Sequence, residues 1–217
     1  MIGGSWPPIC SDAQGVRARD ARLKITLGFD DTERPAVAAL YWEAFGGKLG
    51  RLMGPERKAL PYIADALSPD HAFCARNAAD DILGVAGFKS PDGALVNGQL
   101  AGMVPHYGIP GALWRMAALA ALSSDVDNTR FLIDGLFVAA PFRGQGIGSR
   151  LLQSIVQEAA DRGYDEVRLD VIDTNSRARA LYEQRGFEAV GRNRIGPLSA
   201  LFGFSSATVM VRRLNRL

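Results

Sequence analysis

The stretch from Phe131 to Leu152, FLIDGLFVAAPFRGQGIGSRLL, constrains this chain more than any other. An apolar run ends near a proline, and an arginine, three glycines at alternate positions and a second apolar run follow. The pattern predicts a strand over Phe131–Val138, a glycine turn, and a helix over Gly148–Arg162. A turn so free of side chains, directly before a helix, leaves backbone amides open to a ligand.

This glycine turn is suited to bind an anion. Amides that lead into a helix N-terminus can point together, and the helix dipole adds to their partial positive charge. Arg143 adds a full positive charge, and several amides with a guanidinium favour a pyrophosphate. The alternative is a strand-to-helix turn with an incidental surface arginine, because short glycine motifs often match by chance.

The spacing of the glycines separates this turn from two other nucleotide-binding loops. Gly144, Gly146 and Gly148 do not satisfy the Rossmann pattern G-x-G-x-x-G. The lysine of a P-loop is also missing, because Ser149 and Arg150 follow the last glycine. What remains is Arg-x-x-Gly-x-Gly.

Length and composition favour one soluble domain. The chain has 217 residues, of which 47% are hydrophobic and 22% charged, enough for a sizeable core. The formal net charge is only +2 and the basic residues are scattered, so nucleic acid is not the expected partner.

Cysteine usage and hydropathy predict a cytoplasmic protein without a metal. Cys10 and Cys74 lack the spacing of a disulfide framework or a metal site. The first residues, MIGGSWPPIC, lack the basic start and continuous apolar centre of a signal peptide. The most apolar segment, Gly111–Leu122, is shorter than the ~20 residues of a membrane span and contains Arg115, so we expect a buried or pocket-lining helix and no membrane partner.

The apolar runs predict an α/β or α+β domain over residues 23–217, with residues 1–22 as a loose or peripheral tail. A hairpin followed by two βαβ-like steps implies a mixed sheet with helices on both faces. Lys89–Thr129 is interpreted as an insertion. The other predicted elements are a strand at Lys24–Phe29, a helix from Asp31 that Gly46 and Gly47 can end, a helix from Pro55 that Pro61 should kink or divide, hairpin strands from Ala72 and Ile82, a strand at Glu166–Ile172, a helix near Ser176–Arg185, and final strands FEAVGRN and ATVMVRRL.

Two blocks of the chain resemble the GNAT superfamily of N-acetyltransferases. LFVAAPFRGQGIGSRLL resembles its acyl-CoA-binding motif, and VRLDVIDTNSRARALYEQRGF resembles the block that follows, in the family's order and separation. LYWEAF and ILGVAGF resemble its earlier helix and hairpin more weakly. The resemblance implies one domain with a mostly antiparallel, mixed central sheet.

The resemblance also implies a site for acetyl-CoA as co-substrate. The backbone of Phe137 and Val138 would pair with the pantetheine arm, and Arg143 would lie at the mouth of the turn. The pyrophosphate would be bound by the amides of Gly144, Gln145, Gly146, Ile147, Gly148 and Ser149.

The second block adds further residues on one helix. Asn175 matches a position whose side chain commonly helps to bind the cofactor, and helix capping is an equal alternative. Ala178 and Tyr182 are four residues apart, so both can face the cofactor, the small alanine leaving room for pantetheine. Tyr182 matches the family's general acid, which would protonate the CoA thiolate; packing in the core is the alternative.

Asp134 is the candidate general base for the acceptor amine. It is the only acid in an otherwise apolar strand, where an acid must be solvated, paired or functional. The alternating pattern places Leu136 and Val138 on its face, and a water chain or a pairing role is the alternative. His71 and His106 are isolated, so structural roles are expected, with contact between His106 and the acceptor as a weaker alternative.

These residues predict transfer of an acetyl group from acetyl-CoA to a primary amine of a small molecule or peptide, by direct attack in a ternary complex. No cysteine lies in either block, so no acyl-enzyme intermediate is indicated. The alternative is a non-catalytic acyl-CoA-binding regulatory module. We expect a monomer or homodimer.

Overall fold

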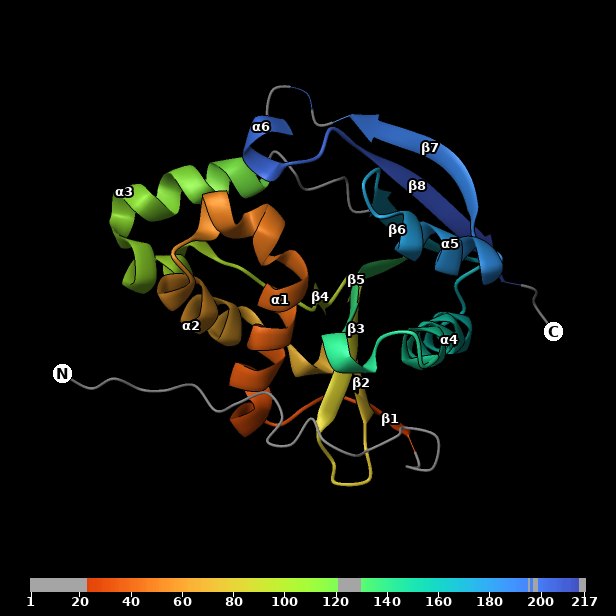
Figure 1. The fold of residues 1–217 in the computed structure, drawn as a ribbon. Coiled ribbons are helices and arrows are strands. Elements are labelled where there is room, and N and C mark those ends of the chain that lie inside the picture. The colour runs from red at the N-terminus through yellow and green to blue at the C-terminus, as the bar shows by residue number, and fades with distance from the viewer. Residues whose placement is uncertain (1–22, 121–129, 195, 197–198, 215–217) are drawn as a thin grey trace.

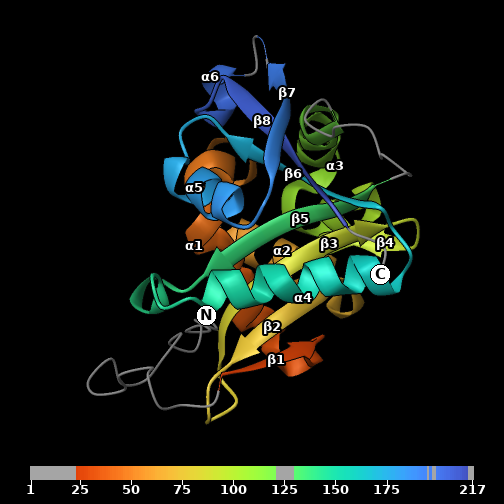
Figure 2. The ribbon, with the colours of Figure 1, turned by 90° about the vertical axis from the view of Figure 1, so that its right-hand side faces the viewer.

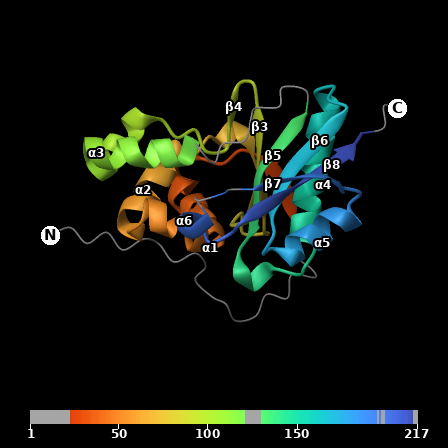
Figure 3. The same ribbon diagram turned by 90° about the horizontal axis from the view of Figure 1, so that it is seen from above.

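A mixed sheet runs through the middle of the molecule, with helices on both of its faces (Figures 1 and 3). The computed structural model describes residues 23–120, 130–194, 196 and 199–214. The predicted tail at 1–22, Cys10, and the end of the 89–129 insertion lie outside these residues.

The strands and helices follow one another in an order close to the predicted one. They are β1 (Lys24–Leu27), α1 (Arg34–Met53), α2 (Glu56–Ala66), β2 (Ala72–Arg76), β3 (Ile82–Ser90), β4 (Gly93–Ala94), α3 (Leu100–Ala120), β5 (Phe131–Val138), α4 (Ile147–Asp161), β6 (Glu166–Ile172), α5 (Ser176–Gln184), β7 (Glu188–Arg194), α6 (Ser199–Phe202) and β8 (Ser206–Arg213).

The sheet has the order β1-β2-β3-β5-β6-β8-β7, with β4 paired to β3. Neighbouring strands are antiparallel except β5 and β6, which are parallel. The predicted mixed, mostly antiparallel sheet is thus confirmed. The helix α4 crosses from β5 to β6 and lies over β2, β3 and β5 (Figure 2).

The two parallel strands at the centre separate soon after they meet. Their pairing consists of Phe131 with Val167 and Leu132 with Arg168. Within the described residues, β5 from Ile133 to Val138 has a partner only on its β3 side. Its other edge therefore keeps backbone groups free to hydrogen-bond a ligand.

Each face of the sheet has its own apolar core. Residues of α1, α2 and α3 pack on one face, with Phe202 of α6, and residues of α4 pack with Tyr182 of α5 on the other. The view from above separates these two groups of helices (Figure 3). β5 lies between both cores: Phe137 belongs to the first, and Phe131 and Ile133 belong to the second.

The helices α1, α2 and α3 differ from the prediction. Gly46 and Gly47 do not end α1, which continues to Met53. Burial of Leu52 and Met53 offsets the cost of about 1 kcal/mol that each glycine brings to a helix interior. Gly46 also makes room for the indole of Trp42, whose ring atoms lie 2.9 Å from where a Cβ would stand.

Pro61 does not divide α2, which is one helix from Glu56 to Ala66. The flanking residues Leu60, Tyr62 and Ile63 are all buried, so packing holds the helix together through the proline. The helix α3 is longer than the predicted Gly111–Leu122 and contains a kink at Gly108, where φ is +70°.

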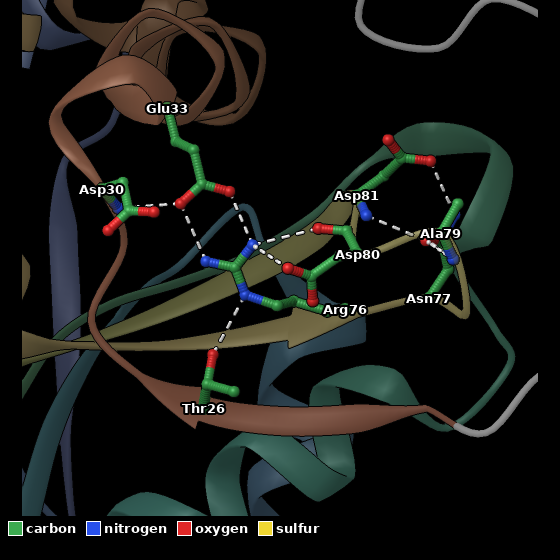
Figure 4. A network of polar contacts seen from close by, with 8 residues as sticks. All are labelled: Thr26, Asp30, Glu33, Arg76, Asn77, Ala79, Asp80 and Asp81. Atoms are coloured by element: carbon green, nitrogen blue, oxygen red, sulfur yellow. Dashed lines mark hydrogen bonds and ion pairs between the residues drawn. The ribbon is translucent and has the colours of Figure 1, made fainter.

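A buried ion-pair network fixes the first strands to α1 (Figure 4). Arg76 is only 7% exposed, and its guanidinium donates to both carboxylate oxygens of Glu33, the residue before α1, at 2.5 and 2.8 Å and to the hydroxyl of Thr26 at 3.1 Å. This hydrogen-bonded pairing lowers the pKa of Glu33. The network positions α1 over the sheet. It was not predicted from the sequence.

Candidate active site

The glycine turn between β5 and α4 has the backbone that its sequence predicts. Gly144 and Gly146 have φ values of +82° and +83°, in the left-handed region that favours glycine. Gly148 lies in the first turn of α4, where a Cβ would meet Leu136 and Leu181 at ordinary contact distances of 3.4 and 3.6 Å, so glycine is not required there. The turn therefore brings the end of β5, the start of α4 and the helix α5 together.

The amides of this turn are open. Within the described residues, the N–H groups from Gly144 through Ser149 have no hydrogen-bond acceptor, whereas the amides of Arg143 and Arg150 on either side are bonded. They stand at the N-terminus of α4, a helix of 15 residues whose dipole favours an anion. The side chain of Ile147 is buried, so only its backbone is available to a ligand.

Arg143 lies at the turn but its guanidinium is already engaged. Its Nε donates to the carbonyl of Val138 at 2.7 Å, and its Nη2 lies 2.6 Å from Oε1 of Glu43 on α1. The same carboxylate oxygen accepts from the amide of Ala140 at 3.2 Å. Arg143 therefore joins α1 to the end of β5, which is a bracing role that the sequence did not indicate.

Arg177 of α5 is the cation that sequence reasoning missed. Its Nη2 lies 3.4 Å from where a Cβ on Gly144 would stand, and the residue is exposed. Its position two residues after Asn175, in the block that follows the turn, was the only available signal. An exposed guanidinium beside open amides adds positive charge to the turn.

The helix α5 presents the predicted face. The side chain of Asn175 accepts from the amide of Ala178 at 3.1 Å, so it is a helix cap. Ala178 and Tyr182 both pack toward the α4 core. Tyr182 is 8% exposed, and burial raises its pKa to about 12, so its hydroxyl keeps its proton at neutral pH. Within the described part of the chain, that hydroxyl has no hydrogen-bond partner.

A β-bulge at Asp134 corrects the predicted alternation in β5. Gly87 of β3 pairs with Gly135, and the next residue, Phe88, pairs with Ile133, so Asp134 has no partner on β3. The extra residue reverses which side chains face which core. Leu136 and Val138 consequently pack toward α4, whereas Asp134 lines a cavity on the α1 side.

This cavity has a volume of about 470 Å³, within the range of small-molecule sites. Its walls come from α1, α2 and α3, and its floor from β3, β5 and β6. The charged residues that line it are Lys89, Asp134, Arg168 and Asp170. The 89–129 segment contributes Val96, Met116 and Leu119 among others, so the predicted insertion forms part of the cavity wall.

Asp134 is reached by water through the cavity, yet protein surrounds its carboxylate on most sides. This desolvation raises its pKa above the usual value for aspartate. Lys89, the backbone of Val96 and Leu95, and His71 act in the opposite direction. A carboxylate with a raised pKa is a stronger base once it has ionised.

The cavity and the glycine turn lie at opposite ends of β5. Leu132, Ile133 and Asp134 line the cavity, whereas Val138 precedes the turn, and neither the turn residues nor Tyr182 line the cavity. The free edge of β5 runs between the two.

The two histidines lie outside this arrangement. His71 is buried, with Nδ1 3.3 Å from the hydroxyl of Ser68 and Nε2 3.1 Å from that of Ser90, which confirms a structural role. Nε2 of His106 lies 3.0 Å from Oδ2 of Asp65, and His106 does not line the cavity. Among the described residues, no group of three potential metal ligands is placed to hold an ion, and none of the described helices has the length and hydropathy to cross a bilayer.

The molecule combines a sheet with one separated pair of strands, open amides at one end of β5 and an acid in a cavity at the other, an arrangement suited to an enzyme that transfers a group between two ligands. The model of the acetyltransferase (GNAT) family matches residues 34–187, and the chain belongs to this family.

Known proteins support the assignment in sequence and in fold. The thialysine N-epsilon-acetyltransferase of Bos taurus is 39% identical over 54 residues, 25% of this chain and 32% of that protein. N-acetyltransferase 8 of Homo sapiens is 41% identical over 78 residues, 36% of this chain and 34% of that protein. The matched part thus spans about a third of either relative. A GCN5-related N-acetyltransferase from Kribbella flavida has the same fold, with a TM-score of 0.59 at 18% identity, over 88% of this chain and 98% of that one.

Proposed function

We propose that the protein transfers an acetyl group from acetyl-CoA to a primary amine of a small molecule or peptide, by direct attack in a ternary complex. The observation that carries this proposal is the run of open amides from Gly144 to Ser149 at one end of β5, with Asp134 in a cavity further back along the same strand. One strand thereby serves both the donor and the acceptor.

The donor is assigned to the turn and the free edge of β5. The amides of the turn, assisted by Arg177, bind the pyrophosphate of acetyl-CoA. Hydrogen-bonded and non-hydrogen-bonded pairs alternate between β5 and β3, and the amide of Ala139 donates to the carbonyl of Leu83. The backbone of Phe137 is therefore turned toward Val85 of β3, and of the two residues expected to pair with pantetheine, Val138 is the one whose backbone faces the gap between β5 and β6. The carbonyl of Val138 already accepts from Arg143, so the amide N–H of Val138 is the group that would donate to pantetheine.

The reaction requires one base and one acid. Asp134 accepts a proton as the amine attacks the thioester carbon, because an ammonium with a pKa near 10 has no lone pair. The carbon–sulfur bond breaks, and the thiolate takes the proton of the Tyr182 hydroxyl. The acylated nitrogen loses its second proton to solvent, and solvent returns a proton to Tyr182, so that one proton remains on Asp134 at the end of the cycle. Tyr182 is suited to this role because its raised pKa keeps it protonated until the thiolate leaves.

The cavity restricts the acceptor to a small amine or a peptide terminus. Its volume of about 470 Å³ is too small for a folded partner and matches the size range of ligand pockets. The name of the bovine relative, a thialysine acetyltransferase, is consistent with an acceptor of amino-acid size.

A Tyr182→Phe variant tests the chemistry. We expect it to bind acetyl-CoA with wild-type affinity while kcat falls by about 10²-fold or more, the usual contribution of a general acid. Binding is measured by calorimetry and turnover by release of free CoA with a panel of amines. Unchanged turnover would remove Tyr182 from the acid role.

Thermal shift measurements discriminate the non-catalytic alternative. Acetyl-CoA and CoA at 100 times their dissociation constants should each stabilise the fold by about 2.7 kcal/mol, whereas NADH should not. Stabilisation by acetyl-CoA without CoA release, for any amine in the panel, would favour a regulatory module. Stabilisation by NADH alone would overturn the assignment of the turn.

A further inference from the structure

The charges on the cavity floor are arranged in two adjacent rows. Lys89 on β3 stands opposite Leu132 on β5, which in turn stands opposite Arg168 on β6. Residues directly opposite one another share a face of the sheet, and all three line the cavity. The first row therefore carries a cation on each side of a leucine.

The second row is acidic. Asp170 lies two residues beyond Arg168 on β6 and so on the same face, and the bulge brings Asp134 to that face on β5. The pairing of β5 with β6 stops at the first row. The two acids consequently lie at the point where the strands have begun to separate.

The four charges are not equally available to a ligand. Arg168 and Asp170 are paired with each other, because Nε of Arg168 lies 3.2 Å from Oδ1 of Asp170. The side-chain amide of Asn193 also donates to Oδ2 of Asp170 at 3.3 Å. Within the described residues, by contrast, neither Lys89 nor Asp134 has an ion-pair partner within 4.0 Å. One cation and one anion without a direct ion-pair partner therefore face the cavity, and the carboxylate of Asp134 accepts only from the backbone of Leu95 and Val96 among the described residues.

We propose that the acceptor carries an anionic group, a carboxylate, in addition to its amine, and that Lys89 binds this carboxylate while Asp134 receives the ammonium. This inference rests on the proposed function. A zwitterionic ligand supplies an ion-pair partner to the half-buried Lys89 and to Asp134, whose carboxylate protein surrounds on most sides although water reaches it through the cavity. A second ammonium in place of the carboxylate would instead be repelled by Lys89.

The walls define the rest of the acceptor. They are apolar and aromatic, and include Leu49, Met53, Ile63, Met116, Tyr41 and Tyr62. Such walls favour an apolar body between or beside the two charges. The class of acceptor is thus an amino acid, or a related amine with a carboxylate and an apolar portion.

Matched acceptors test the proposal. Phenylalanine is compared with phenylalaninamide and phenethylamine, and 6-aminohexanoate with hexylamine and 1,6-diaminohexane, by kcat/KM for CoA release. In the wild type, the better of the two carboxylates should exceed its uncharged counterpart by about tenfold or more, the size expected for one charge-assisted hydrogen bond. The diamine should be the poorest of its set.

Variants of Lys89 identify the residue responsible. Lys89→Met should remove the carboxylate preference, Lys89→Arg should retain most of it, and Lys89→Glu should reverse it in favour of the diamine. Lys24→Met makes the same change at an exposed strand lysine outside the cavity and should leave selectivity unaltered. A reversal of selectivity cannot come from a general loss of folding.

Three results overturn the inference, and each is distinguishable from failure of the proposed function alone. If amines are acetylated without any carboxylate preference, or if Lys89→Met slows every acceptor equally, Lys89 does not bind the acceptor. If no amine releases CoA, calorimetric binding of phenylalanine and 6-aminohexanoate in the presence of CoA decides the matter. Binding that Lys89→Met abolishes upholds the site without turnover, and absence of binding overturns it.

Discussion

The two ends of β5 bind by different means. At the turn, the binding groups are backbone amides, and the residues that matter are those that withhold a side chain. At the cavity, the binding groups are side chains from β3, β5 and β6 under walls from three helices. A backbone site is encoded by consecutive residues, whereas a side-chain site is assembled by the topology of the fold. The first end can therefore be predicted from the sequence, whereas at the second only Asp134 could be.

The largest effect is expected when the carboxylate at the cavity end is removed. Asp134→Asn should lower kcat/KM by about 10²- to 10⁴-fold and leave acetyl-CoA affinity unchanged, since the turn is at the other end of the strand. In the wild type, the acidic limb of the pH–rate profile should lie above the ordinary aspartate value of about 3.9, because desolvation raises the pKa of Asp134. A wild-type limb at the ordinary value would contradict the assigned environment.

Although Asp134→Asn should lower activity, it should raise the stability of the fold near neutral pH. The folded-state pKa of Asp134 is raised, so its ionisation opposes folding as pH increases from the unfolded value to the folded one, and the cost persists above that window. Asp134→Asn should therefore unfold at a higher temperature than wild type near neutral pH. At about pH 3, where both side chains are neutral, the difference should disappear.

A side chain introduced at the turn should lower the affinity for acetyl-CoA and leave the base unaffected. Gly146→Val places a β-branched residue at φ +83°, which displaces the open amides; acetyl-CoA affinity should fall by about tenfold or more. Gly163→Val is a matched control, because φ there is +79° and open space surrounds the Cβ position at both sites. Both variants should lose similar stability, but only Gly146→Val should lose acetyl-CoA affinity in calorimetry.

The smallest effect is expected at the brace between the two regions. Glu43→Gln weakens the contact with Arg143, an ion pair that is partly exposed and worth about 1 kcal/mol or less. We expect the KM for acetyl-CoA to rise by a few fold, with kcat nearly constant. An increase that vanishes in Arg143→Gln, where the pair is already broken, would confirm that the two residues act together.

The sequence predicted the part of the fold that depends on local patterns. The strand, turn and helix from Phe131 onward appear as predicted, because glycines at left-handed φ and an apolar period are local properties. The continuation of α1 through Gly46 and Gly47 was missed, because burial of Leu52 depends on distant residues.

The site shows the same division. Ala178 and Tyr182 lie on one helix face as their spacing predicted, and Asn175 caps that helix. The engagement of Arg143 by Glu43 could not be predicted, since these residues are a hundred positions apart. The row of Lys89 and Arg168 depends on the register of three strands, which no single segment specifies.

The bulge at Asp134 gives β5 two halves that are out of phase. Before it, odd-numbered residues such as Phe131 face α4; after it, even-numbered residues such as Leu136 do. Asp134 is the extra residue of the bulge, and β3 runs past it without an insertion of its own. A chain that lacked Asp134 could therefore keep the same pairing with β3, with Ile133, Leu136 and Val138 still facing α4. The acid is thus an addition to an otherwise regular strand, and deletion should remove the carboxylate from the cavity while leaving the end of the strand beside the turn in place.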